Sequence, residues 1–354
     1  MEITKDFPCG NIQVLSIDGN DIYVEREVRD GTGYFYWAFH VTGAAGKTLR
    51  FIFPGHTRVG CFGAAVSHDF KQWKWSNTKD QVGNGDCFTY TFADDENSTY
   101  FAHDMVYSEE RLLDFTKEND VKLEKFTTSN KGRNVPYFTI GDGEKCVVLT
   151  SRHHACESTG TYVLQGFAEK CLEKRPDGIK FVFVPFVDYD GVVDGDPGKN
   201  RLPYDHNRDY GAESIYKETA RLRELADGGN VLMNFDFHSP HHDSGINDYP
   251  YFMKFDEGEN KIYNTISALL KEATEKDKNS MTYTGEQDQD YGSEWNGKTT
   301  PNNKNYFLKR TILGASLTME TPYFGLCDNM FTQQKAINMG RHLYDAVYEV
   351  LKEI

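Results

Sequence analysis

Two histidines and a glutamate have the types and spacing of metal ligands. Residues 151–157 read Ser-Arg-His-His-Ala-Cys-Glu, which places His154 and Glu157 at His-x-x-Glu spacing. Side chains three residues apart can converge on one ion at a strand end or in a first helical turn. Residues 236–238 read Asp-Phe-His and supply a third candidate, His238. Two neutral imidazoles and one carboxylate form a typical catalytic zinc set, which leaves a fourth position for water.

Both parts of this predicted zinc set follow short apolar runs typical of buried strands. Residues 145–150 precede the His-x-x-Glu run, and residues 230–235 precede His238. In an open α/β sheet, sites assemble beyond the carboxyl ends of the strands, so the three side chains are expected at one edge. A single His-x-x-Glu is common by chance, and these histidines could be ordinary polar residues at strand ends. The third ligand, placed after a second strand, favours a site for one zinc ion.

Four segments carry a resemblance to a known family. Residues 151–157 are similar to its motif Ala-Arg-x-His-Pro-Gly-Glu, and residues 187–192, Val-Asp-Tyr-Asp-Gly-Val, to its Asn-Pro-Asp-Gly-Val. Residues 205–210, Asp-His-Asn-Arg-Asp-Tyr, resemble its Asp-Leu-Asn-Arg-x-Tyr, and residues 317–320, Leu-Thr-Met-Glu, its Thr-Leu-Glu. Together with His238, they occur in the order found in the zinc metallocarboxypeptidase family. The chain most closely resembles the cytosolic carboxypeptidase branch of that family.

The resemblance implies roles for residues outside the metal set. Glu320 is expected to act as general base on the zinc-activated water and as acid toward the leaving amine. Asn207 and Arg208 are expected to bind the terminal carboxylate of the substrate, because guanidinium groups pair with carboxylates in a bidentate manner. Family members also stabilise the developing oxyanion with an arginine. Arg201 is the first candidate for this role, and Lys199 is the alternative.

The tyrosine that caps the substrate in several family members has no clear counterpart here. Tyr291 and Tyr306 lie in or beside a polar, Gly/Asn-rich stretch, residues 276–305, that precedes Glu320. We take Tyr291 as the substrate-binding candidate and keep Tyr306 as the alternative. Loops of this length are uncommon unless they are functional, so we expect substrate-facing residues in this stretch.

Residues 1–97 are expected to form an antiparallel β-sandwich domain. Short runs that alternate in polarity or are rich in aromatic residues are separated by Gly and Asp/Asn turns. These runs are residues 11–17, 22–26, 33–41, 47–53 and 88–92. The resemblance implies the same arrangement, a β-sandwich ahead of the catalytic domain.

Residues 98–354 alternate between helical and strand-like segments, which predicts an α/β domain with a mixed, mostly parallel sheet. Apolar runs typical of strands lie at residues 135–140, 146–150, 180–187 and 230–235. Periodicity typical of amphipathic helices lies at residues 109–117, 161–172, 213–225, 262–273 and 334–352. The resemblance identifies this part as the zinc-carboxypeptidase-like catalytic domain.

The composition is that of an acidic globular protein. The chain has 354 residues, a formal net charge of −15 and 38% hydrophobic residues. Because it has no Lys/Arg cluster, no nucleic-acid partner is expected. A strongly anionic body attracts polyglutamate poorly. The long polar stretch adds the carboxylates Glu286, Asp288, Asp290 and Glu294. We therefore expect the substrate to end in a residue other than an acidic one.

The sequence also bears on location. No apolar run reaches the length of a membrane span, and the first residues, Met-Glu-Ile-Thr-Lys-Asp, lack the basic and hydrophobic regions of a signal peptide. Seven cysteines without CxxC pairs favour reduced thiols over a disulfide framework. These features predict a cytoplasmic protein without a membrane partner, and they leave the oligomeric state open.

The sequence thus predicts a zinc-dependent carboxypeptidase that removes C-terminal residues from peptides. Three alternatives remain: a deglutamylase of the cytosolic carboxypeptidase type, a zinc amidohydrolase that cleaves N-acyl amino acids, and a catalytically inactive zinc-binding protein on the same fold. An inactive protein is expected to lack a metal ligand or the general base. This chain has candidates for all three ligands and for the base. The N-terminal sandwich favours the carboxypeptidase over the amidohydrolase.

Overall fold

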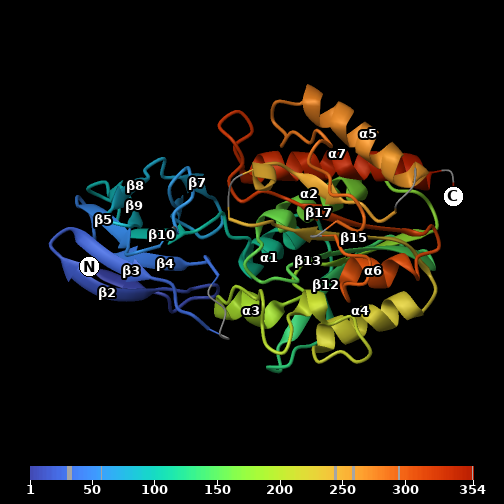
Figure 1. Ribbon diagram of the computed structural model, residues 1–354, viewed down its shortest axis with the longest axis horizontal. Coiled ribbons are helices and arrows are strands. Elements are labelled where there is room, and N and C mark those ends of the chain that lie inside the picture. The colour runs from blue at the N-terminus through green and yellow to red at the C-terminus, as the bar shows by residue number, and fades with distance from the viewer. Residues whose placement is uncertain (30–33, 57, 243–244, 257–259, 294–295, 353) are drawn as a thin grey trace.

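The computed structural model describes the whole chain except residues 30–33, 57, 243–244, 257–259, 294–295 and 353. Two parts lie side by side along the longest axis of the molecule (Figure 1). The first consists of strands β1–β10, and the second surrounds a seven-stranded sheet with helices on both faces. The predicted order, a β-sandwich followed by an α/β part, is the observed one.

Ten short strands form the two sheets of the N-terminal sandwich. One sheet has the order β1-β4-β10-β6-β7, and the other has the order β2-β3-β5-β9-β8. The strands are β1 (Glu2–Thr4), β2 (Gln13–Asp18), β3 (Asp21–Glu25), β4 (Ala38–Thr42), β5 (Thr48–Phe53), β6 (Ala65–Ser67), β7 (Lys74–Trp75), β8 (Asp80–Val82), β9 (Gly85–Thr91) and β10 (Ser98–Ala102). Their pairing is antiparallel except between β3 and β5, which run parallel.

Aromatic side chains fill the space between these two sheets. The ring of Phe39 in β4 lies 5.1 Å from that of Phe51 in β5, measured between centroids. Phe101 in β10 lies 5.4 Å from Phe88 in β9 in the same way. All four side chains are fully buried. Because side chains alternate across a strand, each strand gives one set of residues to this core and the other set to the opposite face.

A seven-stranded sheet forms the centre of the α/β part, in the order β11-β12-β14-β13-β15-β17-β16. Its strands are β11 (Glu124–Thr128), β12 (Asn134–Ile140), β13 (Lys145–Ser151), β14 (Ile179–Val184), β15 (Val231–His238), β16 (Tyr251–Met253) and β17 (Ala315–Glu320). The four central strands β14, β13, β15 and β17 are parallel, and antiparallel strands flank them on both sides. The sheet is therefore mixed with a parallel centre.

Helices cover both faces of this sheet (Figure 1). They are α1 (Glu109–Glu118), α2 (Thr159–Glu173), α3 (Tyr189–Asp194), α4 (Lys217–Asp227), α5 (Lys261–Lys276), α6 (Asn303–Leu308) and α7 (Gln333–Leu351). In the view of Figure 1, α2, α5 and α7 lie above the sheet, and α4 and α6 lie below it. Gly166 of α2 and Gly340 of α7 allow these helices to touch, because a Cβ at Gly166 would lie 1.9 Å from the Ile337 carbonyl oxygen.

The register of the parallel strands brings their carboxyl ends to one edge. Ser151 at the end of β13 lies opposite Phe237, and His238 at the end of β15 lies opposite Glu320 at the end of β17. The His-x-x-Glu run begins three residues after Ser151, so all of these polar side chains emerge at the same edge of the sheet.

The two parts share a continuous apolar core. The sandwich residues Trp73 and Trp75 belong to the same buried cluster as Phe324 and Phe331 of the α/β part. The indole N–H of Trp75 donates to the Phe331 carbonyl oxygen at 2.9 Å, and its ring meets that of Phe324 edge to face. Strand β10 lies within the sandwich sheet, so the sandwich continues past residue 97, where the sequence places its end.

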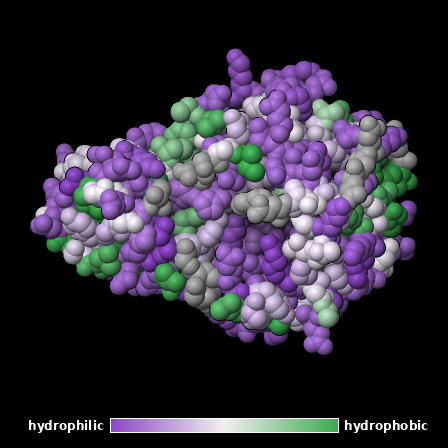
Figure 2. Space-filling model, in the orientation of Figure 1, coloured by the Kyte–Doolittle hydropathy of each residue, from purple (hydrophilic) through white to green (hydrophobic). Residues whose placement is uncertain are grey.

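The visible face of the molecule is mostly polar. Figure 2 shows a mostly hydrophilic face on which apolar side chains occur in small scattered groups. None of the described helices combines the length and the apolar character needed to cross a membrane.

Candidate active site

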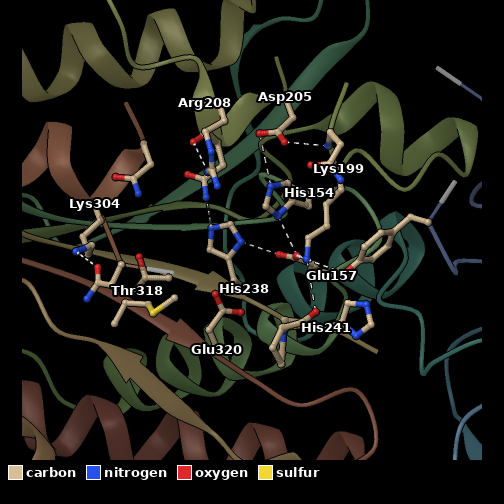
Figure 3. A pocket seen from close by; sticks show the side chains of 18 of the residues that line it. His154, Glu157, Lys199, Asp205, Arg208, His238, His241, Lys304, Thr318 and Glu320 are labelled. Carbon is tan, nitrogen blue, oxygen red and sulfur yellow. Dashed lines mark hydrogen bonds and ion pairs between the residues drawn. The ribbon is translucent and has the colours of Figure 1, made fainter. Parts of the chain in front are cut away.

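His154, Glu157 and His238 meet at the carboxyl edge of the sheet (Figure 3). One potential ligand atom from each lies within 4.8 Å of the others. The backbone N–H of Glu157 donates to the His154 carbonyl oxygen at 3.1 Å and closes a turn directly before α2. This turn folds the His-x-x-Glu run back on itself, so its first and last side chains face the same point. The structure thus assembles the group that the sequence predicts.

The two imidazoles present the same ring nitrogen to the carboxylate. Nδ1 of His154 lies 2.9 Å from Oε1 of Glu157, and Nδ1 of His238 lies 2.6 Å from Oε2. On the far side, Nε2 of His238 lies 2.8 Å from Oδ2 of Asp236, and Nε2 of His154 lies 3.6 Å from Oδ1 of Asp205. The carboxylate of Asp236 favours the tautomer of His238 that has its proton on Nε2, which leaves the Nδ1 lone pair for a metal. The donor set therefore fits zinc.

Charge inside this group is balanced by close pairing. Burial opposes charge on His238, but the carboxylates of Asp236 and Glu157 outweigh it and raise its pKa well above the usual range. Burial also opposes charge on Glu157, but the neighbouring His154, Lys199 and His238 hold its pKa well below the usual range. Neighbouring opposite charges favour the ionised form of each group.

A chain of buried hydrogen bonds connects the metal group to the next element. Asp236 uses Oδ1 to contact Nδ1 of His153 at 2.8 Å, and Nε2 of His153 lies 2.7 Å from the Tyr210 hydroxyl. Asn303, at the start of α6, donates its side-chain amide to the same hydroxyl at 3.1 Å. The backbone N–H of Asn303 donates to Oδ1 of Asn207 at 3.4 Å. The metal group and Asn207 are therefore tied to one rigid network.

Glu320 ends β17 beside His238 and lines the same pocket. Its Oε2 atom is buried and has no hydrogen-bond partner among the described residues. Burial, with a smaller contribution from Glu157, raises the pKa of Glu320 to about 7. A carboxylate with an unused oxygen and a pKa near neutrality has the properties of a general base.

Lys199 enters the pocket, whereas Arg201 is held elsewhere. The ammonium of Lys199 lies 2.6 Å from Oε1 of Glu157. The guanidinium of Arg201 contacts Asp188 at 3.0 Å and Asp196 at 3.4 Å, and it is absent from the described pocket lining. Lys199, the alternative candidate for the oxyanion role, therefore lies at the site, and Arg201, the first candidate, does not line the described pocket.

Asn207 and Arg208 line the pocket from a single short element, the 3-10 helix η1 (His206–Arg208). The side-chain amide of Asn207 lies 3.4 Å from Nε2 of His238. The Arg208 guanidinium donates to the Asn207 carbonyl oxygen at 3.0 Å. Two donors thus stand next to the metal group, where a carboxylate could be bound.

The tyrosines of the pocket differ from those that the sequence indicates. The Tyr306 hydroxyl donates to Asp227 at 2.8 Å, and the Tyr291 ring centre lies 4.6 Å from the Lys304 ammonium. Neither tyrosine is among the described residues that line the pocket. Tyr34 and Tyr251 line it instead. Tyr34 comes from the segment before β4 in the sandwich, and its hydroxyl accepts from Lys199 at 3.0 Å. No motif marks these two tyrosines, because long-range packing alone brings them to the site.

Comparison with known proteins identifies the fold. No protein-family model matches the chain. A crystal structure of a metallo-carboxypeptidase from Burkholderia cenocepacia superposes with a TM-score of 0.81 at 20% identity, covering 99% of both chains. A metallo-carboxypeptidase from Pseudomonas aeruginosa, solved in complex with (2-guanidinoethylmercapto)succinic acid, gives a TM-score of 0.79 at 18% identity over 100% of both chains. The chain thus has the metallo-carboxypeptidase fold.

Sequence comparison points in the same direction. An uncharacterized protein from Zymomonas mobilis is 25% identical over 259 residues, which cover 67% of each chain. Human cytosolic carboxypeptidase 2 is 28% identical over 204 residues, which cover 48% of this chain. The match spans only 22% of that human protein's length. The chain is thus similar in sequence to cytosolic carboxypeptidases, as its motifs predict.

Proposed function

We propose that the protein is a zinc-dependent carboxypeptidase that removes C-terminal residues from peptides. One observation carries this proposal: a buried His-Glu-His group shares a pocket with an Asn-Arg pair and with Glu320, whose Oε2 has no hydrogen-bond partner among the described residues. The pocket encloses about 290 Å³, which is enough for the last residues of an extended peptide. The metallo-carboxypeptidase fold and the similarity to cytosolic carboxypeptidases support the same function.

Each group of pocket residues has its own role in this reaction. His154, Glu157 and His238 would hold a zinc ion, which as a Lewis acid would polarise a carbonyl group and make water more acidic. Glu320 takes a proton from the attacking water and returns it to the departing amine. Lys199 donates to the oxygen of the attacked carbonyl as negative charge develops there.

Arg208 and Asn207 set the exopeptidase character. Their donors bind the α-carboxylate of the last residue, which fixes the scissile bond over the metal group. An amidohydrolase acting on N-acyl amino acids would use the same contacts. The two activities differ in whether a long peptide on the acyl side of the scissile bond is accepted.

Peptides with a free or an amidated C-terminus test this function. Wild-type protein loaded with zinc should release the last residue from the free acid and leave the amide intact, because only the acid presents a carboxylate to Arg208. Glu320→Gln should keep its zinc and lower kcat by about 10²- to 10⁴-fold. Glu286→Gln is a matched control, because that exposed residue lies outside the pocket.

The same assay separates the alternatives. Equal cleavage of both peptides would contradict the carboxypeptidase proposal. Cleavage of N-acyl amino acids alone would identify an amidohydrolase, and zinc binding without any turnover would identify an inactive zinc-binding protein.

A further inference from the structure

A second pocket adjoins the active site at Asn302, which is the one described residue that lines both. It encloses about 350 Å³ beside helices α4 and α6 and the end of the long polar stretch. These two helices lie below the sheet in Figure 1, where Arg223 of α4 lies against the ring of Tyr306 of α6. A pocket of this size is within the range of sites for small organic ligands.

Positive charge dominates the lining of the second pocket. Its described lining residues include no carboxylate and four basic side chains, which are Arg223, Lys298, Lys309 and Arg310. The active-site pocket, in contrast, is lined by cations together with the carboxylates of Glu157, Asp205 and Glu320. The chain has a net charge of −15, so its overall composition does not account for a purely cationic lining.

The carboxylates of the long polar stretch lie elsewhere. Asp288 accepts a hydrogen bond from Tyr283, and Asp290 pairs with Lys254 at 2.8 Å. Neither they nor Glu286 line the second pocket or the active site, and Glu294 lies outside the described residues. In the described part of the chain, this stretch therefore adds no negative charge to either lining.

The guanidinium of Arg310 has a counter-charge within the protein. Its Nε donates to Asp227, and the Tyr306 hydroxyl donates to the same carboxylate at 2.8 Å. The guanidinium also lies 3.6 Å from the centre of the Tyr306 ring. One carboxylate and one tyrosine thus hold this arginine in place at the edge of the second pocket.

The neighbouring Arg223 makes no ion pair with a carboxylate of any described residue. Its guanidinium lies 5.1 Å from the centre of the Tyr306 ring. It donates to Oγ of Ser214 at 3.0 Å and to the carbonyl oxygen of Ala212 at 3.1 Å, and both partners are neutral. Its Nε is buried and has no hydrogen-bond partner among the described residues. A charge that has lost water without gaining a counter-charge is stabilised when an anion binds beside it.

We propose that the second pocket binds a phosphate group. Arg223 and Lys309 supply the positive charge, because a guanidinium binds phosphate oxygens through paired hydrogen bonds and an ammonium acts as a point charge. Phosphate carries nearly two negative charges at neutral pH and so matches several cations better than a carboxylate does. The volume leaves room for the organic part of a phosphate monoester. This site is separate from the substrate pocket and does not depend on the proposed function.

Binding of inorganic phosphate to the full chain tests the inference. Calorimetric titration of the wild-type protein should show saturable binding that weakens as salt is added. Arg223→Gln should lower the affinity by about 10- to 100-fold, as expected for one charge-assisted contact. Arg221→Gln is the matched control on the same helix. Arg221 pairs with Glu224 at 2.8 Å and does not line the second pocket, so this variant should bind phosphate as the wild type does.

Lys309→Gln keeps the test independent of the folding of Arg223→Gln. Lys309 is exposed, so its replacement should leave the fold intact and weaken phosphate binding by a few-fold, since exposed charges are screened. Absence of saturable binding to the wild-type protein would overturn the inference. Wild-type affinity in the folded Arg223→Gln and Lys309→Gln variants would overturn it too.

The active site is the other cationic place where phosphate could bind, and Arg208→Gln distinguishes the two. Phosphate in the second pocket should still bind to Arg208→Gln and be lost from Arg223→Gln. The opposite result would assign the ion to the active site and overturn the inference. Because these titrations need no peptide, their outcome does not depend on whether the protein is a carboxypeptidase.

Three further ligands define the chemistry of the second pocket. Acetate carries a single charge and should bind at least about tenfold more weakly than phosphate, and equal binding of acetate would contradict a phosphate site. Glycerol 3-phosphate carries the same group on an organic part, and glycerol is its uncharged control. Tighter binding of glycerol 3-phosphate than of inorganic phosphate would identify a phosphate monoester as the ligand, and the reverse order would identify the free ion.

Discussion

At the scale of single residues, the pocket depends on which charges are compensated and which are not. Opposite charges around Glu157 and His238 lower the pKa of the glutamate and raise the pKa of the histidine. In the part of the chain that the structure describes, no carboxylate pairs with Lys304, and Oε2 of Glu320 has no hydrogen-bond partner. The uncompensated groups are the ones that a substrate would complete, because protein contacts already satisfy the others.

At the scale of elements, three parallel strand ends and two short helices hold the site. Strands β13, β15 and β17 end at the edge where the metal group and Glu320 emerge. Helix η1 carries Asn207, and α6 begins with Asn303 and continues with Lys304. The hydrogen bonds of Tyr210 connect these elements. They therefore hold the His-Glu-His group at a defined distance from Asn207.

Tyr210→Phe tests this connection. The change removes the hydroxyl that contacts His153 and Asn303 while it keeps the ring in the core. We expect zinc affinity to fall by about tenfold and KM to rise by a few-fold, because Asp236 and Asn207 are less firmly placed. Competition with a chelator measures the zinc affinity, and steady-state kinetics measure KM.

Tyr306→Phe is the matched control for this change. Its ring lies 5.7 Å from that of Tyr210, but its hydroxyl donates to Asp227 away from the site. Equal zinc affinity in wild type and Tyr210→Phe would show that the network has only a structural role.

At the scale of the whole molecule, the sandwich and the α/β part share one buried core. Their common core contains Trp75 and Phe331, and the sandwich contributes Tyr34 to the pocket. Asn11 adds a buried hydrogen bond to the Gly195 carbonyl oxygen at 2.8 Å. We expect the two parts to unfold together, because separating them would expose apolar side chains of the shared core to water.

Trp75→Ala measures the strength of this junction. Loss of a buried indole should lower the free energy of unfolding by about 3–5 kcal/mol and shift a single calorimetric transition. Leu15→Ala, on the exposed strand β2, should change it by less than about 0.5 kcal/mol. Two separate transitions in the wild-type protein would contradict a shared core.

The sequence by itself predicted the two-part architecture and the metal group. The period of apolar residues is a local property, so it indicated most strands and helices near their observed positions. The His-x-x-Glu spacing and the apolar run before His238 are local features too. The three side chains come together because parallel strands have their carboxyl ends at one edge of a sheet. The predicted helix at 213–225 begins only at Lys217, because the preceding residues hydrogen-bond to Asp209.

Only the tertiary structure decided which side chains complete the pocket. It placed Lys199 rather than Arg201 beside Glu157, because two aspartates hold the arginine elsewhere. It brought in Tyr34 from another part of the chain, and it turned Lys304 inward at the start of α6. These positions depend on the paths of long loops and on packing between distant segments. No periodicity or motif encodes such paths, so sequence patterns predict the metal group more readily than the substrate pocket.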